Sequence, residues 1–157
     1  AIYFADPDGN GLEFYADRPP AEWPYAANGE VAMTTRPLDV RALLAAAAPA
    51  SATPLAGASW GHLHLRVTDL ERSEAFYRAQ LGLEVTQRSY PGARFLAADG
   101  YHHHLGLNTW GAPSQPRPPD ALGLIEATFA RANFGAKDVL VDPDAIHLRV
   151  VPLEPPR

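Results

Sequence analysis

The chain has 157 residues, of which 46% are hydrophobic and 20% charged, as in an ordinary globular protein. This length suits one modest domain or two small modules packed together. The net charge of −5 and the lack of a basic cluster argue against a general nucleic-acid binder. No apolar run reaches the roughly 18 residues that cross a bilayer. The absence of cysteine excludes disulfides and Cys-ligated metals, and no signal peptide is visible, so we expect a cytoplasmic protein.

Residues 1–17, AIYFADPDGNGLEFYAD, predict a β-hairpin. Apolar runs at 2–4 and 12–15 flank two strong turn dipeptides, Asp-Gly and Asn-Gly. Glu13 lies on the strand face opposite to Leu12, and the strand pattern alone makes it a solvated carboxylate. The first predicted strand begins at the very start of the chain, so we expect a longer gene product that has been trimmed.

Residues 18–58 predict a connector, because six prolines punctuate them and only Leu38–Ala48 can hold a short helix. A structureless loop of this length is uncommon inside a compact domain. We therefore interpret residues 18–58 as a linker between the terminal hairpin of an upstream module, at residues 1–17, and the unit that follows, with the boundary near Ala58.

Residues 60–82, WGHLHLRVTDLERSEAFYRAQLG, organise the rest of the chain. Polar and apolar side chains alternate over six residues from His62, which predicts a strand with one buried face and one open face. A helical period follows, with an N-cap at Thr68 or Asp69 and a stop at Gly82. The predicted apolar stripe of this helix is Leu70, Ala75, Phe76, Ala79 and Leu81. The side chains left on the open face of the strand are His62, His64 and Arg66.

Three further strands are predicted at Leu83–Tyr90, Arg94–Ala98 and Tyr101–Trp110, with turns at Pro91-Gly92 and Asp99-Gly100. Residues 59–110 thus form a strand–helix–strand–strand–strand unit. In its last strand, alternation places Leu105 and Leu107 under the helix. His103 is expected to point to that side as well. The open face is predicted to carry His102, His104, Gly106, Asn108 and Trp110.

Beyond a Pro-rich linker at residues 111–120, residues 121–157 predict a smaller partner module. Two or three strands are expected within 123–131 and 137–151, around Phe134-Gly135 and a turn at residues 142–144. The segment DPDAIHLRV repeats DPDGNGLEF of the first hairpin in register. Its predicted buried face is Ile146, Leu148 and Val150, with His147 and Arg149 on the other.

Three motifs carry a resemblance to a known family. GHLHLRVTDLERSEAFYRAQLGLEV is similar to the first strand and helix of the vicinal oxygen chelate superfamily, which includes glyoxalases, bleomycin-resistance proteins and extradiol dioxygenases. YFADPDGNGLEFY resembles the last hairpin of a module of that fold, and YHHHLGLNTWGAP resembles the two-domain catechol extradiol dioxygenase branch. The resemblance implies an α+β fold, in which βαβββ modules form a cupped mixed sheet and the second module is degenerate.

The resemblance also implies a divalent metal held by two histidines and one carboxylate. Iron(II) is the expected metal, and manganese(II) is the alternative. His62 matches the first-strand ligand, and Glu13 matches the last-strand carboxylate of an earlier module. Glu126 and Arg149 stand where the family has a histidine and a glutamate. Glu126 is therefore a second candidate ligand, and no complete triad can be assembled from matched positions.

The implied function is ring cleavage of a catechol-type aromatic by a metal-dependent extradiol dioxygenase. His102 and His104 are predicted to act as acid–base groups, because imidazole titrates near neutral pH. The residues predicted to bind substrate are His64, Arg66, Asn108, Trp110 and Arg149. A homodimer is expected, since an incomplete half-barrel leaves sheet edges open. Two alternatives stay open, both without a working metal site: a small-ligand or drug-binding module of the same fold, and an inactive half of a larger dioxygenase.

Overall fold

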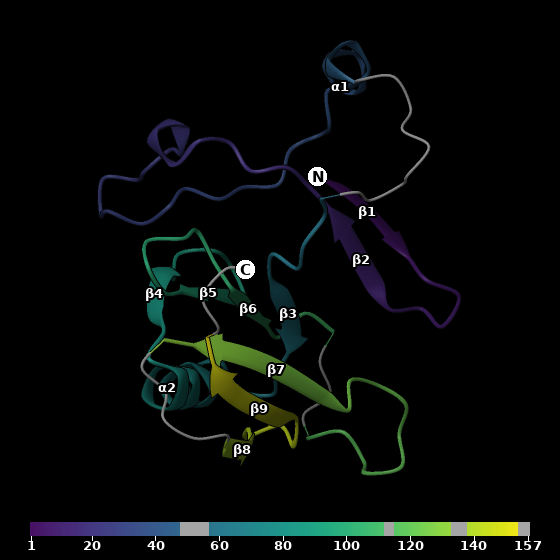
Figure 1. The fold of residues 1–157 in the computed structure, drawn as a ribbon, viewed down its shortest axis with the longest axis vertical. Helices are drawn as coiled ribbons and strands as arrows, with labels where there is room; N and C mark the ends of the chain where they lie inside the picture. Colours follow the sequence, from purple (N-terminus) through teal and green to yellow (C-terminus); the bar gives the residue numbers. More distant parts are fainter. Residues whose placement is uncertain (48–56, 112–114, 133–137, 154–157) are drawn as a thin grey trace. The chain divides into compact units, whose positions relative to one another are not determined.

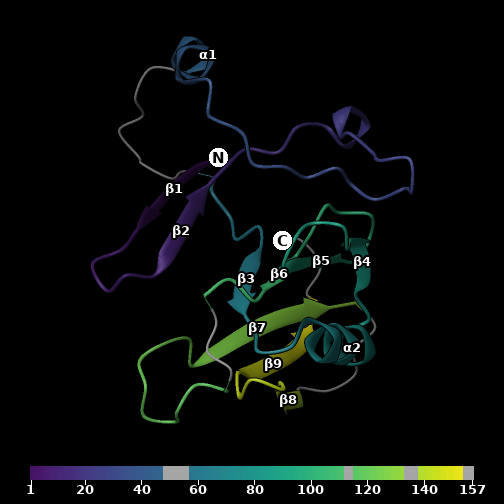
Figure 2. The same cartoon turned by 180° about the vertical axis from the view of Figure 1, so that it is seen from behind.

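The computed structural model describes residues 1–47, 57–111, 115–132 and 138–153. The chain divides into two compact units, Ala1–Trp60 and Gly61–Arg157 (Figure 1), and Figure 2 shows the same ribbon from behind. This division falls close to the boundary predicted near Ala58. The division of the two units into a hairpin, linkers and modules stays a prediction. Among the described residues, no helix has both the length and the apolar character needed to cross a membrane.

The first unit contains the predicted hairpin. Its elements are β1 (Ile2–Ala5), β2 (Gly11–Phe14), the 3-10 helix η1 (Pro20–Glu22) and α1 (Val40–Ala46). The two strands pair antiparallel, with Tyr3 opposite Glu13. Asp6 fixes the turn, because one of its carboxylate oxygens accepts hydrogen bonds from the backbone N–H groups of Asp8 and Asn10.

The second unit contains the predicted strand–helix–strand–strand–strand arrangement. Its elements are β3 (Leu63–Arg66), α2 (Leu70–Leu81), β4 (Glu84–Gln87), β5 (Ala93–Ala97) and β6 (Leu105–Asn108). The strands form one mixed sheet in the order β3-β6-β5-β4, in which β3 and β6 are parallel and the other pairs antiparallel. The predicted α+β class is confirmed, although β4 and β6 are shorter than their sequence patterns predict.

A second sheet follows in the same unit. It is formed by β7 (Glu126–Arg131), β8 (Asp138–Val141) and β9 (His147–Pro152), in the order β7-β9-β8. β7 and β9 are parallel, and β8 and β9 are antiparallel. The connection predicted around Phe134-Gly135 lies outside the described residues.

Helix α2 begins and ends where the sequence predicts, but it buries a different face. The Asp69 side chain caps its N-terminus, and Gly82 ends it in the left-handed conformation. Ala75 and Ala79 are exposed, so the predicted apolar stripe was wrong at these two positions. Tyr77 is fully buried instead. The reason is a polar contact from a distant segment, which a helical period alone does not reveal.

That contact comes from the turn between β8 and β9, which has the same hydrogen bonds as the first hairpin. One carboxylate oxygen of Asp142 accepts from the backbone N–H groups of Asp144 and Ile146, at 2.9 and 2.7 Å, as Asp6 does in the β1–β2 turn. The other oxygen of Asp142 accepts the Tyr77 hydroxyl at 2.7 Å. The predicted repeat is therefore present in hydrogen bonding as well as in sequence.

One apolar core joins α2 to both sheets. Its buried members are Leu65, Val67, Leu70, Tyr77, Leu81, Leu83, Leu96, Leu105, Leu107, Leu148 and Val150. Asp144 adds a polar attachment at the edge of this core, because its carboxylate accepts from the N–H and the hydroxyl of Thr68 at 3.0 and 2.6 Å. The second sheet is thereby fastened to the connection between β3 and α2.

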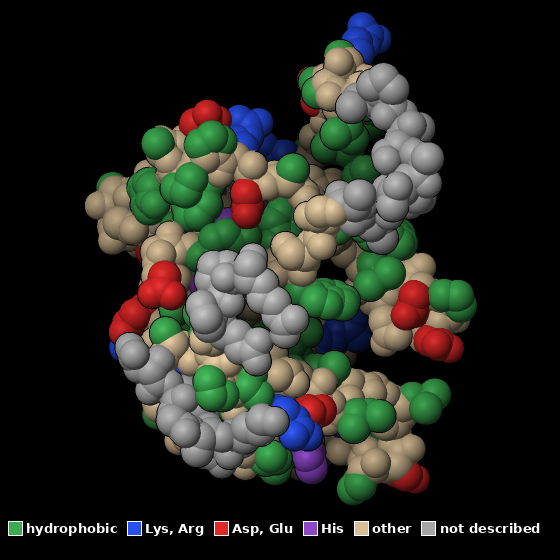
Figure 3. Space-filling view, viewed as in Figure 1, with side chains coloured by type: hydrophobic (Ala, Val, Ile, Leu, Met, Phe, Trp, Pro, Cys, Tyr) green, Lys and Arg blue, Asp and Glu red, His purple; other side chains and the backbone are tan. Residues whose placement is uncertain are grey.

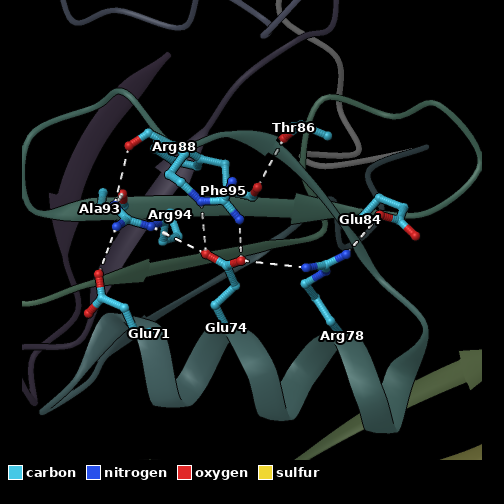
Figure 4. A network of polar contacts seen from close by, with 9 residues as sticks. All are labelled: Glu71, Glu74, Arg78, Glu84, Thr86, Arg88, Ala93, Arg94 and Phe95. Carbon is cyan, nitrogen blue, oxygen red and sulfur yellow. Dashed lines mark hydrogen bonds and ion pairs between the residues drawn. The ribbon is translucent and has the colours of Figure 1, made fainter.

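Charged side chains also join α2 to the four-stranded sheet β3-β6-β5-β4 (Figure 4). The Glu74 carboxylate, only 11% exposed, contacts Arg88, Arg94 and Arg78, with Arg94 at 3.3 Å and Arg78 at 3.8 Å. Arg94 also pairs with Glu71 at 3.0 Å. On the face seen in Figure 3, acidic and basic side chains of the described residues are scattered rather than gathered in one patch.

Candidate metal centre

Three histidine side chains of the second unit lie close enough together to hold one metal ion. They are His62, His64 and His103, and one ring nitrogen from each lies within 4.8 Å of the other two. His62 directly precedes β3, His64 lies on β3, and His103 lies in the segment before β6. Among the described residues, no carboxylate belongs to this group, so its three candidate ligands are all imidazoles.

Strand β3 presents His64 as the alternating pattern predicts. Leu65 is buried in the core while His64 is exposed on the opposite face. Gly106 is paired with His64 on one side and with Phe95 on the other. A Cβ atom at Gly106 would lie 3.0 Å from Cε1 and Nδ1 of the His64 ring. The glycine therefore leaves the space in which that imidazole lies.

His103 was predicted to point away from the open face, and this prediction was wrong. Its side chain is buried, and its ring centroid lies 4.2 Å from that of His62 and 5.2 Å from that of His64. Period-two alternation does not extend through this segment, because the chain turns at residues 98–101 and β6 begins only at Leu105. The turn carries the His103 ring over the face on which His64 lies.

The ring of His103 is in contact with a histidine nitrogen on each side. Its Nε2 lies 3.1 Å from Nε2 of His64, and its Nδ1 lies 2.8 Å from Nδ1 of His102. Burial, followed by the charges of His62 and the other neighbouring imidazoles, lowers the pKa of His103 to about 2. The His103 side chain is therefore neutral at physiological pH, which is the form that binds a metal.

His104, which the sequence predicts as an acid–base group, supports the turn. Its Nδ1 accepts the backbone N–H of Ala98 at 3.2 Å, and its ring lies 4.9 Å from that of Tyr101. Burial lowers the pKa of His104, an effect that the carboxylate of Asp99 partly opposes. In this structure His104 thus helps to hold the loop that presents His103.

The distances in the histidine group suit a metal with imidazole ligands. Two nitrogen ligands with bonds of about 2.0–2.1 Å lie about 2.9–3.4 Å apart at octahedral or tetrahedral angles. The 3.1 Å between His64 and His103 falls in this range. A separation at the 4.8 Å limit of the group would close by about 1 Å or more on metal binding.

Of the two carboxylates predicted as ligands, Glu126 belongs to the same unit as the histidine group and is paired with an arginine. Glu126 on β7 makes two hydrogen bonds with the guanidinium of Arg149 on β9, at 2.8 and 2.9 Å. This pairing with Arg149 lowers the pKa of Glu126. Glu13 lies on β2 in the first unit, opposite Tyr3, so its role as a ligand stays a prediction.

Aromatic rings extend from the histidine group along β5 and its neighbouring loops. Phe95 lies 4.9 Å from His103 between ring centroids, and Tyr90 lies 5.8 Å from both Phe95 and Trp110. The indole N–H of Trp110 donates to the carbonyl of Pro91 at 3.0 Å. Sequence reasoning proposed Trp110 and missed Tyr90 and Phe95. Phe95 could have been found from its position opposite Gly106, which is itself opposite His64, but this register is known only once the strands are paired.

Arg66 and Asn108 are paired positions of β3 and β6. The Arg66 side chain is exposed, whereas Asn108 is buried and its amide oxygen accepts the N–H of Trp110 at 3.2 Å. Their predicted role in substrate binding stays a prediction, and the contact with Trp110 links Asn108 to the aromatic rings.

Comparison with known proteins gives a family match and one close curated relative. The family model described as Glyoxalase/Bleomycin resistance protein/Dioxygenase superfamily matches residues 59–147. A protein of Bacillus subtilis (strain 168) named catechol-2,3-dioxygenase is 44% identical in an alignment of 128 residues that covers 79% of this chain. The match covers 45% of that relative, so the chain spans less than half of its length.

Solved structures give weaker likenesses. A lactoylglutathione lyase from Agrobacterium tumefaciens aligns with 57% of this chain and 89% of its own, at 17% identity and a TM-score of 0.41. An integron cassette protein from the mobile metagenome of V. cholerae aligns with 59% of this chain and 93% of its own, at 19% identity and a TM-score of 0.41.

Proposed function

Since the chain belongs to the Glyoxalase/Bleomycin resistance protein/Dioxygenase superfamily, we propose that it provides the metal centre of a ring-cleaving dioxygenase for catechol-type aromatics. The observation that carries this proposal is the group of His62, His64 and His103, found in a chain 44% identical to a protein named catechol-2,3-dioxygenase. Because the chain covers less than half of that relative, the activity of the whole relative is part of the proposal.

The metal would be held by the imidazoles of His62, His64 and His103, and nitrogen ligands of this kind suit iron among several transition metals. Iron(II) is our first choice and manganese(II) the second. When bound, the ion would supply a Lewis-acidic positive charge for the oxygen atoms of a catechol. Glu13 remains a candidate carboxylate ligand, whereas both carboxylate oxygens of Glu126 accept hydrogen bonds from Arg149.

The remaining side chains would orient the ring and handle protons. The buried ring of Phe95 beside His103 offers an apolar surface for an aromatic substrate, with Tyr90 and Trp110 farther out. We keep His102 and His104 as the proposed acid–base groups, and the ring centroid of His102 lies 6.1 Å from that of His62. Association into a homodimer also remains a proposal.

The test is O₂ consumption by the iron(II)-reconstituted protein with catechol, measured beside a His62→Ala variant. His147→Ala serves as the matched control, because His147 is an exposed histidine on β9, outside the metal group. We expect consumption by the native chain and the control, and its loss in His62→Ala. Equal rates in all three proteins, or no rate in any of them, would contradict the proposal.

A second candidate is a module of the same fold that binds an aromatic ligand without turnover. The ion pair of Glu126 and Arg149 favours it, because these residues stand where the resemblance places metal ligands. In that case catechol would bind to the metal-free protein. Reconstitution with iron(II) would then change neither the affinity for catechol nor the O₂ concentration.

A further inference from the structure

The arrangement of His64, His103 and His102 restricts where their protons can be. His103 lies between the other two, with its Nε2 at 3.1 Å from His64 and its Nδ1 at 2.8 Å from His102. A neutral imidazole has one N–H donor and one lone pair. His103 therefore donates to one of its neighbours and accepts from the other.

Two directions of this hydrogen-bond chain are compatible with the distances. In the first, His64 donates to Nε2 of His103, whose Nδ1–H donates to Nδ1 of His102. In the second, every donor and acceptor is reversed, and the proton of His103 lies on Nε2, among the other imidazoles. Only the first direction turns a lone pair of His103 toward the metal group. For His64 to bind a metal through the same Nε2, its proton would have to move to its own Nδ1, which keeps the ring neutral and requires no change at His102.

We propose that His102 is a positioning residue, whose Nδ1 accepts the Nδ1–H of His103 and so fixes the His103 tautomer with its Nε2 lone pair toward His64. A histidine ligand commonly donates its second ring N–H to such a partner, which orients the ring and raises its basicity. The role as a metal ligand rests on the proposed function, but the tautomer is a property of the metal-free chain.

The local structure holds His102 in place for this role. Its backbone carbonyl accepts the Thr86 hydroxyl at 2.6 Å, which ties the loop to β4. The ring of Tyr101 lies 4.1 Å from the His102 ring between centroids. His102 therefore has a fixed backbone and a packed ring, as a residue that orients a neighbour requires.

The experiment compares three variants, His102→Ala, His102→Asn and His102→Gln. The side-chain oxygen of asparagine falls near the position of Nδ1 and that of glutamine near Nε2, so only asparagine keeps the acceptor that the proposal needs. A purely structural role would favour glutamine, which is closer to histidine in size. Thermal unfolding of each variant shows whether it is folded, and His147→Ala is again the control for loss of an exposed histidine.

Two readouts are made on each protein. Nitrogen-15 NMR of the metal-free imidazoles should show His103 protonated at Nδ1 in the native chain and in His102→Asn, and a mixture of tautomers in the other two variants. Zinc, titrated as a diamagnetic probe, should bind about 10–100-fold more weakly to His102→Ala and His102→Gln than to the native chain, with most of the affinity restored in His102→Asn.

The two proposals fail in different ways. A native chain that binds no zinc would refute the metal centre, and the NMR result would still decide the role of His102. A native His103 protonated at Nε2 would overturn the role of His102, and so would a glutamine variant that matches the native tautomer and zinc affinity.

Discussion

Replacement of Gly106 by alanine tests whether the space beside His64 matters for metal binding. The new Cβ would lie 3.0 Å from two atoms of the His64 ring and 3.2 Å from a third. Carbon atoms in contact lie about 3.5–4.0 Å apart, so the ring must move by about 0.5 Å or more. β6 is paired on both sides, with β3 and β5, and the backbone cannot easily move instead.

A shift of this size exceeds the roughly 0.2 Å that metal–ligand distances tolerate. We expect zinc affinity to fall by about 10-fold or more, a loss like that for changes beside metal ligands. His64 is exposed and can swing outward, so the free energy of unfolding should change by only about 0.5–1 kcal/mol.

The assay is competition for zinc against a chromophoric chelator, with thermal unfolding measured on the same samples. Gly11→Ala is the matched control, because Gly11 also lies in a strand and an added Cβ there would meet no atom within 4 Å. Native zinc affinity in Gly106→Ala would refute the reasoning, and so would an equal loss in the Gly11 control.

Three further predictions concern the core and the ion pairs. Tyr77→Phe should destabilise the protein by about 1–3 kcal/mol, because Asp142 loses a buried hydrogen-bond donor. Burial and the charge of Asp142 raise the pKa of Tyr77 above its usual 10, so the unfolded chain loses this proton first. The free energy of unfolding should therefore fall as the pH rises above 10, and less steeply in Tyr77→Phe. If urea unfolding shows the same fall with pH in both proteins, this prediction is contradicted. Glu74→Gln should cost about 1–2 kcal/mol in thermal unfolding, less than a fully buried pair because two of its arginine partners are about half exposed, and no loss would show that the network adds nothing. Glu126→Gln should leave zinc affinity unchanged, because Arg149 holds this carboxylate; a large loss would make Glu126 the ligand that the sequence predicts.

Local patterns predicted those parts of the fold that local interactions decide. The alternation from His62 predicted β3 and its exposed His64, and the cap at Asp69 with the stop at Gly82 predicted the bounds of α2. Ala75 was misplaced because an apolar side chain suggests burial, although the buried position is taken by the polar ring of Tyr77. Its partner lies 65 residues away in the chain, beyond the reach of a helical period.

The candidate site shows the same division. His62 was found from the sequence because it matches the first-strand ligand of the family motif, and it directly precedes β3 in the structure. His103 was assigned to the wrong face, because the strand pattern was extended through a turn in which Asp99 and Gly100 have positive φ. The Asp-Gly dipeptide is recognised as a turn from the sequence. The direction in which His103 then points depends on hydrogen bonds that the sequence does not show, such as the one from the His104 N–H to the carbonyl of Leu96 on β5.

The central claim is that His62, His64 and His103 form one metal site, and the iron content of the reconstituted protein tests it most directly. The measurement compares the native chain with His103→Ala, after removal of any affinity tag that contains histidine. We expect one tightly bound iron(II) per chain, which is lost in the variant while thermal unfolding shows that the fold persists. A native chain that retains no iron, or a His103→Ala variant that retains as much as the native chain, would contradict it.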